Sequence, residues 1–578
     1  MHLPFLKPLK ETMEVRDVFL GLNHNLRPGP GEFYDMRNLS SDLFPVMSNR
    51  QQRSVVKESG NFLGLADRDG LAYVDGPGFY INGRKTDLVL SEEGPKQLVS
   101  MGAYVIILPD KKYFNTADFG DFGSIEAEVT TSAPVKIYPC TLEGQEIRPD
   151  FLGSVTPENP PDRSWWLDYD RKELKQYSAV TGLWAVLNTP YVKLECPNLG
   201  AGFFPYDGVT IKGEEALGDL RGAAVLYGAE KDAVIIPGII REAMTVTGPV
   251  TISRKIPEMD FCIESGNRLW GCRYGPDAEG RIVNELYCSK LGDFRNFSCY
   301  MGISTDSYTV SLGSEGPFTG AVSYGGHPLF FKENCLHKVF GSMPSNFSVQ
   351  TTACRGVQQG CDRSLSVVSE VLYYKSRSGV CAYDGSLPGE ISEALGKEPY
   401  EQAAAGSIGG KYYISMLGKE GWALFCYDTE KNLWHREDDL QGKLFCRCRE
   451  SLFCADGKGR LIDLMGRTGE KESEPVAFMA ESPIIGISLP GNRYLSRLAI
   501  RLFMEPGALL TLKVKYDSCG PYENLGTIRG MNLKSFTVPV VPRRADHLQL
   551  KLEGEGNIRV FALTQIIKQG SDSPVFGG

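Results

Sequence analysis

The feature that most constrains the fold of this chain is a strand pair that recurs about every 40 residues. In each copy a hydrophobic strand, a short polar turn and a second hydrophobic strand follow one another. The apolar segments that begin at Leu329, Leu372, Tyr412 and Leu452 are spaced 43, 40 and 40 residues apart. A period of this length, carrying strands only, is typical of β-propeller blades, because a four-stranded blade buries both of its faces only against its neighbours.

Seven copies of the strand pair can be located along the chain. Their first strands are residues 70–74, 104–108, 267–272, 327–332, 370–375, 410–415 and 450–455. The chain also contains 64 glycines among 578 residues, which suits many short strands joined by tight turns. The sequence therefore predicts an all-β protein built on a seven-bladed β-propeller.

Two further β modules are expected beside the propeller. The interval of 164 residues between Tyr104 and Arg268 is too long for one connection, so we expect a small β-barrel or sandwich inserted at 122–256. After the polar segment 466–478, period-2 alternation predicts a C-terminal β-sandwich. The expected domains are an N-terminal arm and start of the propeller (1–60), first blades (61–121), the inserted module (122–256), further blades (257–466), the sandwich (476–568) and a flexible tail (569–578).

Several motifs give the chain a family resemblance. They are GLNHNLRPGP (21–30), YDMRNLSSDLFPVMSNRQQR (34–53), NRLWGC (267–272), LYCSKLGDFRNF (286–297), STDSYTVSLGSEGPFTGAV (304–322), LFFKEN (329–334), VLYYKSRSGVCAYDG (371–385), YDTEKNLWHRED (427–438) and RRADHLQLKLEGEGNIRVFALTQI (543–566). In this order they resemble the β-propeller tail proteins of tailed bacteriophages, a group that includes the nozzle proteins of short-tailed phages. The N-terminal segment would then pack along the propeller as an arm or closing strand, with a turn at 38–42 leading into the first blade.

The resemblance implies a structural virion protein that forms a ring or tube around the DNA exit channel of the tail. We expect a homo-oligomer of six copies, contacts with other tail or head–tail connector proteins, and viral DNA that crosses the lumen without specific binding. A formal net charge of −9 fits a lumen that does not bind DNA tightly. The N-terminus has no apolar run typical of a signal peptide or membrane span, so we expect synthesis in the bacterial host cytoplasm and a final location in the virion.

Three tryptophans in the expected insertion define an alternative function. Trp165, Trp166 and Trp184 could stack on a sugar ring, since aromatic faces suit that role. A host-surface carbohydrate-binding protein at the tail tip is therefore the second interpretation, and a packed hairpin core is the structural explanation of the same residues. A glycan hydrolase on a propeller scaffold is the third interpretation.

The sequence itself singles out no catalytic or metal site. No two of its 71 acidic residues can be selected as a glycosidase pair, and its six histidines lack metal-ligand spacing. We therefore expect no enzymatic activity, no cofactor and no metal. The 15 cysteines are scattered through apolar strands, and we expect all of them to be reduced.

Overall fold

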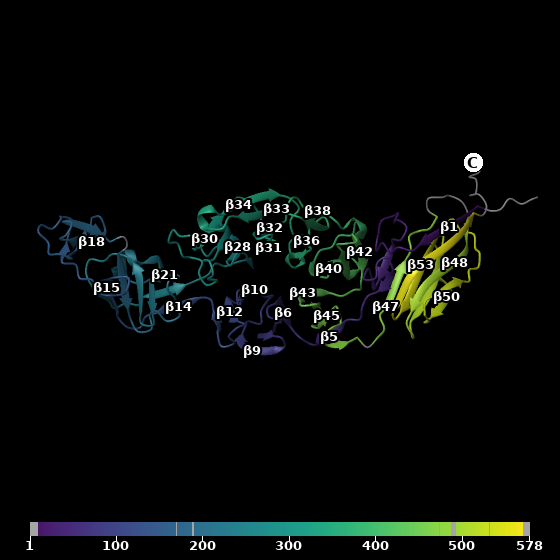
Figure 1. Cartoon of the computed structure of the whole chain (residues 1–578), viewed down its shortest axis with the longest axis horizontal. Helices are drawn as coiled ribbons and strands as arrows, with labels where there is room; N and C mark the ends of the chain where they lie inside the picture. Colours follow the sequence, from purple (N-terminus) through teal and green to yellow (C-terminus); the bar gives the residue numbers. More distant parts are fainter. Residues whose placement is uncertain are drawn as a thin grey trace, which may run out of the picture. The chain divides into compact units, whose positions relative to one another are not determined.

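The computed structural model describes residues 10–168, 170–187, 190–472, 474–486, 493–530 and 532–569. Regular structure in these residues is nearly all β-strand, which confirms the all-β class (Figure 1). The described helices are four short 3-10 turns at Glu215–Leu220, Pro344–Asn346, Asp362–Ser364 and Glu393–Leu395. Among the described residues no helix has the length and apolar character needed to cross a membrane. From residue 570 onward, the predicted flexible tail lies outside the described part of the chain.

The chain divides into two compact units. The first takes its described residues from 1–95, 331–336 and 352–578, and the second comprises 96–330 and 337–351. The six-part domain division drawn from the sequence stays a prediction.

Four sheets of the blade type belong to the first unit. They are β6 (Phe62–Asp67), β7 (Leu71–Asp75), β8 (Gly78–Ile81) and β9 (Arg84–Val89); β35 (Ser366–Val368), β36 (Val371–Lys375), β37 (Val380–Tyr383) and β38 (Gly389–Glu390); β39 (Ala403–Ile408), β40 (Lys411–Gly418), β41 (Gly421–Asp428) and β42 (Leu433–Arg436); and β43 (Gly442–Cys448), β44 (Ser451–Asp456) and β45 (Leu461–Asp463) with β5 (Ser54–Lys57) and β46 (Glu470–Lys471). The first strands of neighbouring sheets touch, since β39 contacts both β35 and β43, and β43 also contacts β6. Each sheet therefore buries a face against the next, as blades do.

The hairpin between β39 and β40 shows why this segment turns where it does. Gly409 and Gly410 form its two-residue turn with φ angles of 57° and 74°. Two successive positive φ angles suit the right-handed twist of a hairpin and favour glycine over any residue with a Cβ.

The N-terminal segment is shared between a blade-type sheet and the C-terminal sandwich. Strand β5 pairs with β45 and so completes the sheet that begins at β43. The sandwich has one sheet of β3 (Leu39–Ser40), β4 (Met47–Asn49), β53 (Ile558–Gln569), β48 (Arg493–Met504) and β51 (Lys534–Val538), with β1 (Glu11–Arg16) also on β53. Its other sheet is β2 (Asp35–Arg37), β47 (Ala477–Glu481), β52 (Leu548–Glu555), β49 (Leu509–Tyr516) and β50 (Glu523–Arg529). In Figure 1 the purple N-terminal strands accordingly lie beside the yellow C-terminal strands.

Three more blade-type sheets lie wholly or mostly in the second unit. They are β10 (Gln97–Met101), β11 (Tyr104–Leu108), β12 (Lys112–Asn115) and β13 (Phe122–Ser124); β27 (Phe261–Glu264), β28 (Leu269–Pro276), β29 (Ile282–Cys288) and β30 (Tyr308–Ser311); and β31 (Gly320–Tyr324), β32 (His327–Lys332), β33 (Cys335–Phe340) and β34 (Ser348–Ala353). The described residues thus contain seven sheets of this type along the chain. Closure of all seven into one ring stays a prediction.

The second unit also holds three sheets between β13 and β27. Two of them enclose a shared core that includes Val135, Leu194 and Ile211. These two are β14 (Ala127–Thr130), β26 (Thr251–Arg254), β21 (Gly208–Lys212) and β22 (Gly222–Val225), and β23 (Gly228–Glu230), β24 (Ala233–Pro237), β20 (Tyr191–Glu195), β15 (Val135–Cys140) and β25 (Met244–Val246). The third is a small sheet of β16 (Phe151–Leu152), β17 (Trp165–Asp168), β18 (Glu173–Ser178) and β19 (Leu183–Val186).

The four residues that defined the repeat occupy matching places. Leu329, Leu372, Tyr412 and Leu452 each lie on the second strand of a sheet, and each side chain is fully buried. The period of about 40 residues therefore reflects one buried position per sheet.

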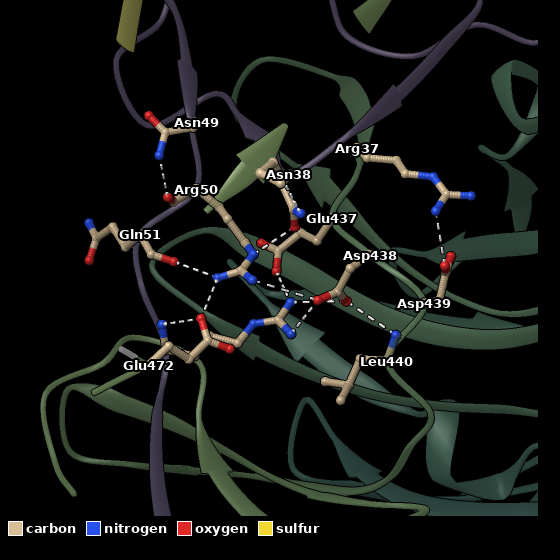
Figure 2. A network of polar contacts seen from close by, with 12 residues as sticks. Arg37, Asn38, Asn49, Arg50, Gln51, Glu437, Asp438, Asp439, Leu440 and Glu472 are labelled. Atoms are coloured by element: carbon tan, nitrogen blue, oxygen red, sulfur yellow. Dashed lines mark hydrogen bonds and ion pairs between the residues drawn. The ribbon is translucent and has the colours of Figure 1, made fainter. Parts of the chain in front are cut away.

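A buried network of charges anchors the N-terminal segment to the rest of the first unit (Figure 2). Arg53 Nη2 lies 2.6 Å from Glu437 Oε2, and Arg53 Nη1 lies 2.7 Å from Asp438 Oδ2. Arg50 joins the network at 3.7 Å from Asp438 and 3.5 Å from Glu472. Burial alone would lower the pKa of Arg53, but the two carboxylates outweigh burial and raise it.

Candidate functional site

The structure brings together two of the three tryptophans predicted as a binding site. Trp165 and Trp166 are neighbours on β17, so strand alternation sends their side chains to opposite faces of the small sheet. Across the sheet, Trp166 pairs with Lys175 and Tyr177 pairs with Trp184. Because Lys175 and Tyr177 are two residues apart on β18, all four side chains share one face, which we call the tryptophan face.

Trp184 is the centre of an aromatic cluster on the tryptophan face. Its ring centroid lies 5.4 Å from that of Trp166 in an edge-to-face arrangement, and 5.3 Å from that of Tyr177. Phe151, from the first strand of the sheet, places a third ring 6.2 Å away. Contacts of this kind hold the Trp184 ring in one orientation, which favours a preformed stacking surface.

Charged side chains lie next to these rings. Lys175 Nζ is 2.9 Å from Asp168 Oδ2 and 2.8 Å from Glu173 Oε2. The same ammonium lies 4.4 Å from the centroid of the Trp166 ring, a cation–π contact. The hydrogen bond from Lys175 lowers the pKa of Asp168 below its usual value. Burial opposes the charged form of Lys175, but its bonds to Glu173 and Asp168 raise the pKa of the ammonium.

The three tryptophans differ in what their rings can still contact. Trp166 is only 4% exposed, and its Nε1 donates a hydrogen bond to the carbonyl of Gly153 at 2.8 Å. Trp165 packs on the opposite face against a small core that contains Leu167 and Leu174. Trp184 is half-buried and keeps part of its ring accessible. Glycan binding by the three residues stays a prediction, and Trp184 is the one whose environment suits it.

The sequence analysis did not identify the residues that surround the tryptophans on this face. Asp168, Glu173, Lys175 and Tyr177 become neighbours of the tryptophans only through the register of β17, β18 and β19. The available signal was the strand geometry of ELKQYS, because residues two apart on a strand point to the same side and this places Lys175 and Tyr177 together. Among the described residues, no group of three His, Cys, Asp or Glu side chains is arranged to hold a metal ion.

No protein-family profile and no curated protein sequence matches this chain. Solved structures with a general likeness include an exo-β-1,3-galactanase from Phanerochaete chrysosporium with β-1,3-galactotriose, at 9% identity and a TM-score of 0.21 over 52% of this chain and 94% of the galactanase. Trypanosoma rangeli sialidase has 9% identity and a TM-score of 0.24 over 98% of this chain and 97% of its own. Phage phi92 endosialidase has 8% identity and a TM-score of 0.16, and the match covers 81% of this chain and 62% of the endosialidase.

These matches correct one expectation and leave another open. The expected absence of enzymatic activity is contradicted, because the matched structures are a galactanase, a glycoside hydrolase and sialidases. Identities near 9% and TM-scores of 0.24 or less nevertheless transfer no reaction to this chain. The phage protein among these structures is an endosialidase rather than a tail nozzle, so the nozzle role stays a prediction.

Proposed function

We propose that this chain is a bacteriophage tail component that binds carbohydrate of the host surface through the tryptophan face. The observation that carries the proposal is the half-exposed Trp184 ring, held by three aromatic neighbours beside the ion-paired Lys175. A sugar ring offers an apolar C–H face for Trp184 and hydroxyl groups for the charged side chains. Proteins bind such ligands by combining aromatic contact area with a few fixed polar groups.

Surface exposure near this face supports the same role. Val180 at the β18–β19 turn is 95% exposed, and Val186, which pairs with Lys175 on the tryptophan face, is 47% exposed. Exposed apolar side chains that gather on one small element are typical of interaction surfaces. The tip of this sheet therefore offers apolar area around Trp184 for a chain of several sugar units.

The test is binding of the purified chain to an array of bacterial surface glycans. We expect binding that falls at least tenfold in a Trp184→Ala variant, since loss of a stacked ring removes most of the apolar contact. Leu183→Ser is the matched control, because Leu183 is the preceding residue of β19 and its side chain points to the opposite face. Equal losses in both variants, or no binding by the unchanged chain, would refute the proposal. The same glycans are then assayed for release of reducing ends, which separates binding from hydrolysis.

A second candidate role is a subunit of a ring around the DNA channel of the tail. The supporting observation is a set of exposed large apolar side chains in the N-terminal segment: Met13, Val15, Val18, Leu20, Leu26, Tyr34 and Leu43. Apolar side chains collected on one segment suit docking onto a second copy of the chain, and heterologous contacts of this kind close into rings. A reconstruction of the intact virion tests this role, and six copies around the DNA path is the expected arrangement.

A further inference from the structure

A cavity of about 340 Å³ lies within the first unit. It shares no residue and no strand with the tryptophan face. It is formed by the N-terminal segment at His24 and Tyr34, the loop that contains Glu398, and the β40–β41 hairpin with Trp422. Arg436, the last residue of β42, completes the wall. This volume is at the lower end of the range of about 300–1,000 Å³ for small-molecule sites, so the cavity suits a single small unit.

Aromatic rings form much of this cavity. Tyr400 and Phe425 are buried and meet edge to face, with ring centroids 5.8 Å apart. The rings of His24 and Tyr34 lie 5.9 Å apart on another side. Trp422 is half-buried at the start of β41 and also lines the space. A ligand in the cavity would therefore meet apolar ring faces from three separate segments of the chain.

Arg436 is a charged side chain in the wall of the cavity, next to these rings. Arg436 Nη2 binds Asp439 at 2.6 Å, and Arg436 Nη1 lies 3.9 Å from Asp35. The remaining guanidinium nitrogen, Arg436 Nε, is buried without a hydrogen-bond partner among the described residues. Because this nitrogen is buried, Arg436 contributes its charge to the cavity wall rather than a hydrogen bond from Nε to a ligand.

Two further carboxylates in the lining, those of Glu398 and Glu420, supply hydrogen-bond acceptors. Glu398 Oε1 accepts a hydrogen bond from the backbone nitrogen of Lys419 at 2.8 Å, and Glu420 lies at the exposed rim. Burial would raise the pKa of Asp35, but its contacts with His24 and Arg436 outweigh burial and lower it, so this third carboxylate stays charged. Lys397 also lines the cavity, so three carboxylates stand against the two cations Lys397 and Arg436, and the lining keeps a small negative charge.

Glycine at position 418 keeps the cavity open. A Cβ at Gly418 would lie 2.5 Å from Glu398 Oε1 and 3.0 Å from a ring carbon of Tyr400. Any side chain at this position would move the Glu398 carboxylate and press against the Tyr400 ring. The hairpin sequence thus preserves the shape of the site.

We propose that this cavity binds one uncharged, hexose-sized sugar unit. Its ring faces suit the C–H face of a sugar, and the carboxylates of Glu398 and Glu420 can accept hydrogen bonds from hydroxyl groups. Three carboxylates against Lys397 and Arg436 leave the lining negatively charged on balance, which disfavours acidic sugars because like charges repel in a partly buried site. The site does not depend on the tryptophan face, so either proposal can fail without the other.

The experiment measures binding of galactose, glucose, N-acetylglucosamine and N-acetylneuraminic acid to the full chain by saturation-transfer NMR and calorimetry. At least one uncharged sugar should bind, and N-acetylneuraminic acid should bind at least tenfold more weakly. Every sample carries Trp184→Ala, which removes the tryptophan face as a second sugar site and leaves the cavity lining unchanged. In this background, Trp422→Ala should weaken binding at least tenfold.

A second variant keeps the proposal testable where Trp422→Ala lowers stability. Glu398→Gln preserves shape and removes one acceptor charge, and it should weaken sugar binding at least threefold while thermal melting stays within about 2 °C. Binding of none of the three uncharged sugars would overturn the proposal. Binding that survives both Trp422→Ala and Glu398→Gln would also overturn it, as would tighter binding of N-acetylneuraminic acid.

Discussion

Replacing Arg53 by methionine should destabilise the first unit by about 3 kcal/mol. Methionine keeps much of the side-chain volume but removes the cation that lies 2.6 Å from Glu437 and 2.7 Å from Asp438. Removing one partner of a buried ion pair costs roughly 3–5 kcal/mol, because the remaining charge stays buried without compensation. We take the lower value, since the Asp438 side chain is 28% exposed and keeps Arg50 at 3.7 Å.

The matched control is Arg37→Met in the same region (Figure 2). Arg37 Nη1 lies 3.0 Å from Asp439, but the two side chains are 45% and 53% exposed. Exposed pairs contribute about 0–1 kcal/mol, so this variant should unfold nearly as the unchanged chain does. Urea unfolding followed by tryptophan fluorescence gives both values, and hydrogen exchange of peptides that contain β5 assigns the transition to the first unit. An Arg53→Met variant no less stable than Arg37→Met would refute the argument.

The pH dependence gives a second readout of the same network. Burial would raise the pKa of Asp438, but Arg53 and Arg50 outweigh burial and lower it. A carboxyl group whose folded pKa is lowered stabilises the fold above its unfolded pKa of about 3.9, and loses this contribution as pH falls through the folded value. The stability difference between the unchanged chain and Arg53→Met should therefore be full near pH 6 and shrink below about pH 4.

Three further predictions concern turns, thiols and modularity. Gly409→Val should lower the free energy of unfolding in urea by about 1–2 kcal/mol, because residue 409 has a φ of 57°, in the left-handed region that residues with a Cβ avoid. An unchanged unfolding midpoint would contradict this. Ellman's reagent should label exposed Cys519 first in the native chain, since twelve of the 15 cysteines are buried and burial raises the pKa of Cys140 to about 11; rapid reaction of more than three thiols would contradict this. Replacing residues 127–254 by a short Gly/Ser linker should leave the urea transition of the first unit in place, because that unit contains none of them; loss of the transition would contradict this.

The repeat could be predicted from sequence because each copy carries its signal locally. Leu329 and Tyr412 each follow a Gly-Gly turn by a few residues, and each fills a fully buried place on the second strand. The paths of β2, β3 and β4 could not be predicted, because these strands have two or three residues each and no alternation. Strand β3 pairs with β4, but β2 pairs with β47 and β4 pairs with β53, each of which lies more than 400 residues away in the sequence.

The sequence analysis named the three tryptophans of the candidate site, but it did not predict which of their side chains lie together. Adjacency of Trp165 and Trp166 already implied opposite faces on a strand, so only one of them could join Trp184. The partnership of Trp184 with Lys175 depends on the register of two hairpins, which sequence does not fix. The cavity beside Trp422 depends even more on tertiary structure, because its walls come from residues 24–35, 395–400 and 418–436.

The path of the N-terminal segment determines how assembly can be tested. Strands β1 to β4 belong to the sandwich, β5 completes a blade-type sheet, and the buried Arg53 network lies between them. Removal of residues 1–50 would therefore take strands from the sandwich, and failure to enter particles would not separate lost docking from unfolding. Leu26→Asp avoids this problem, because Leu26 is 89% exposed and lies outside every strand. If the exposed apolar side chains dock onto another copy, this variant should fold normally and still fail to enter particles.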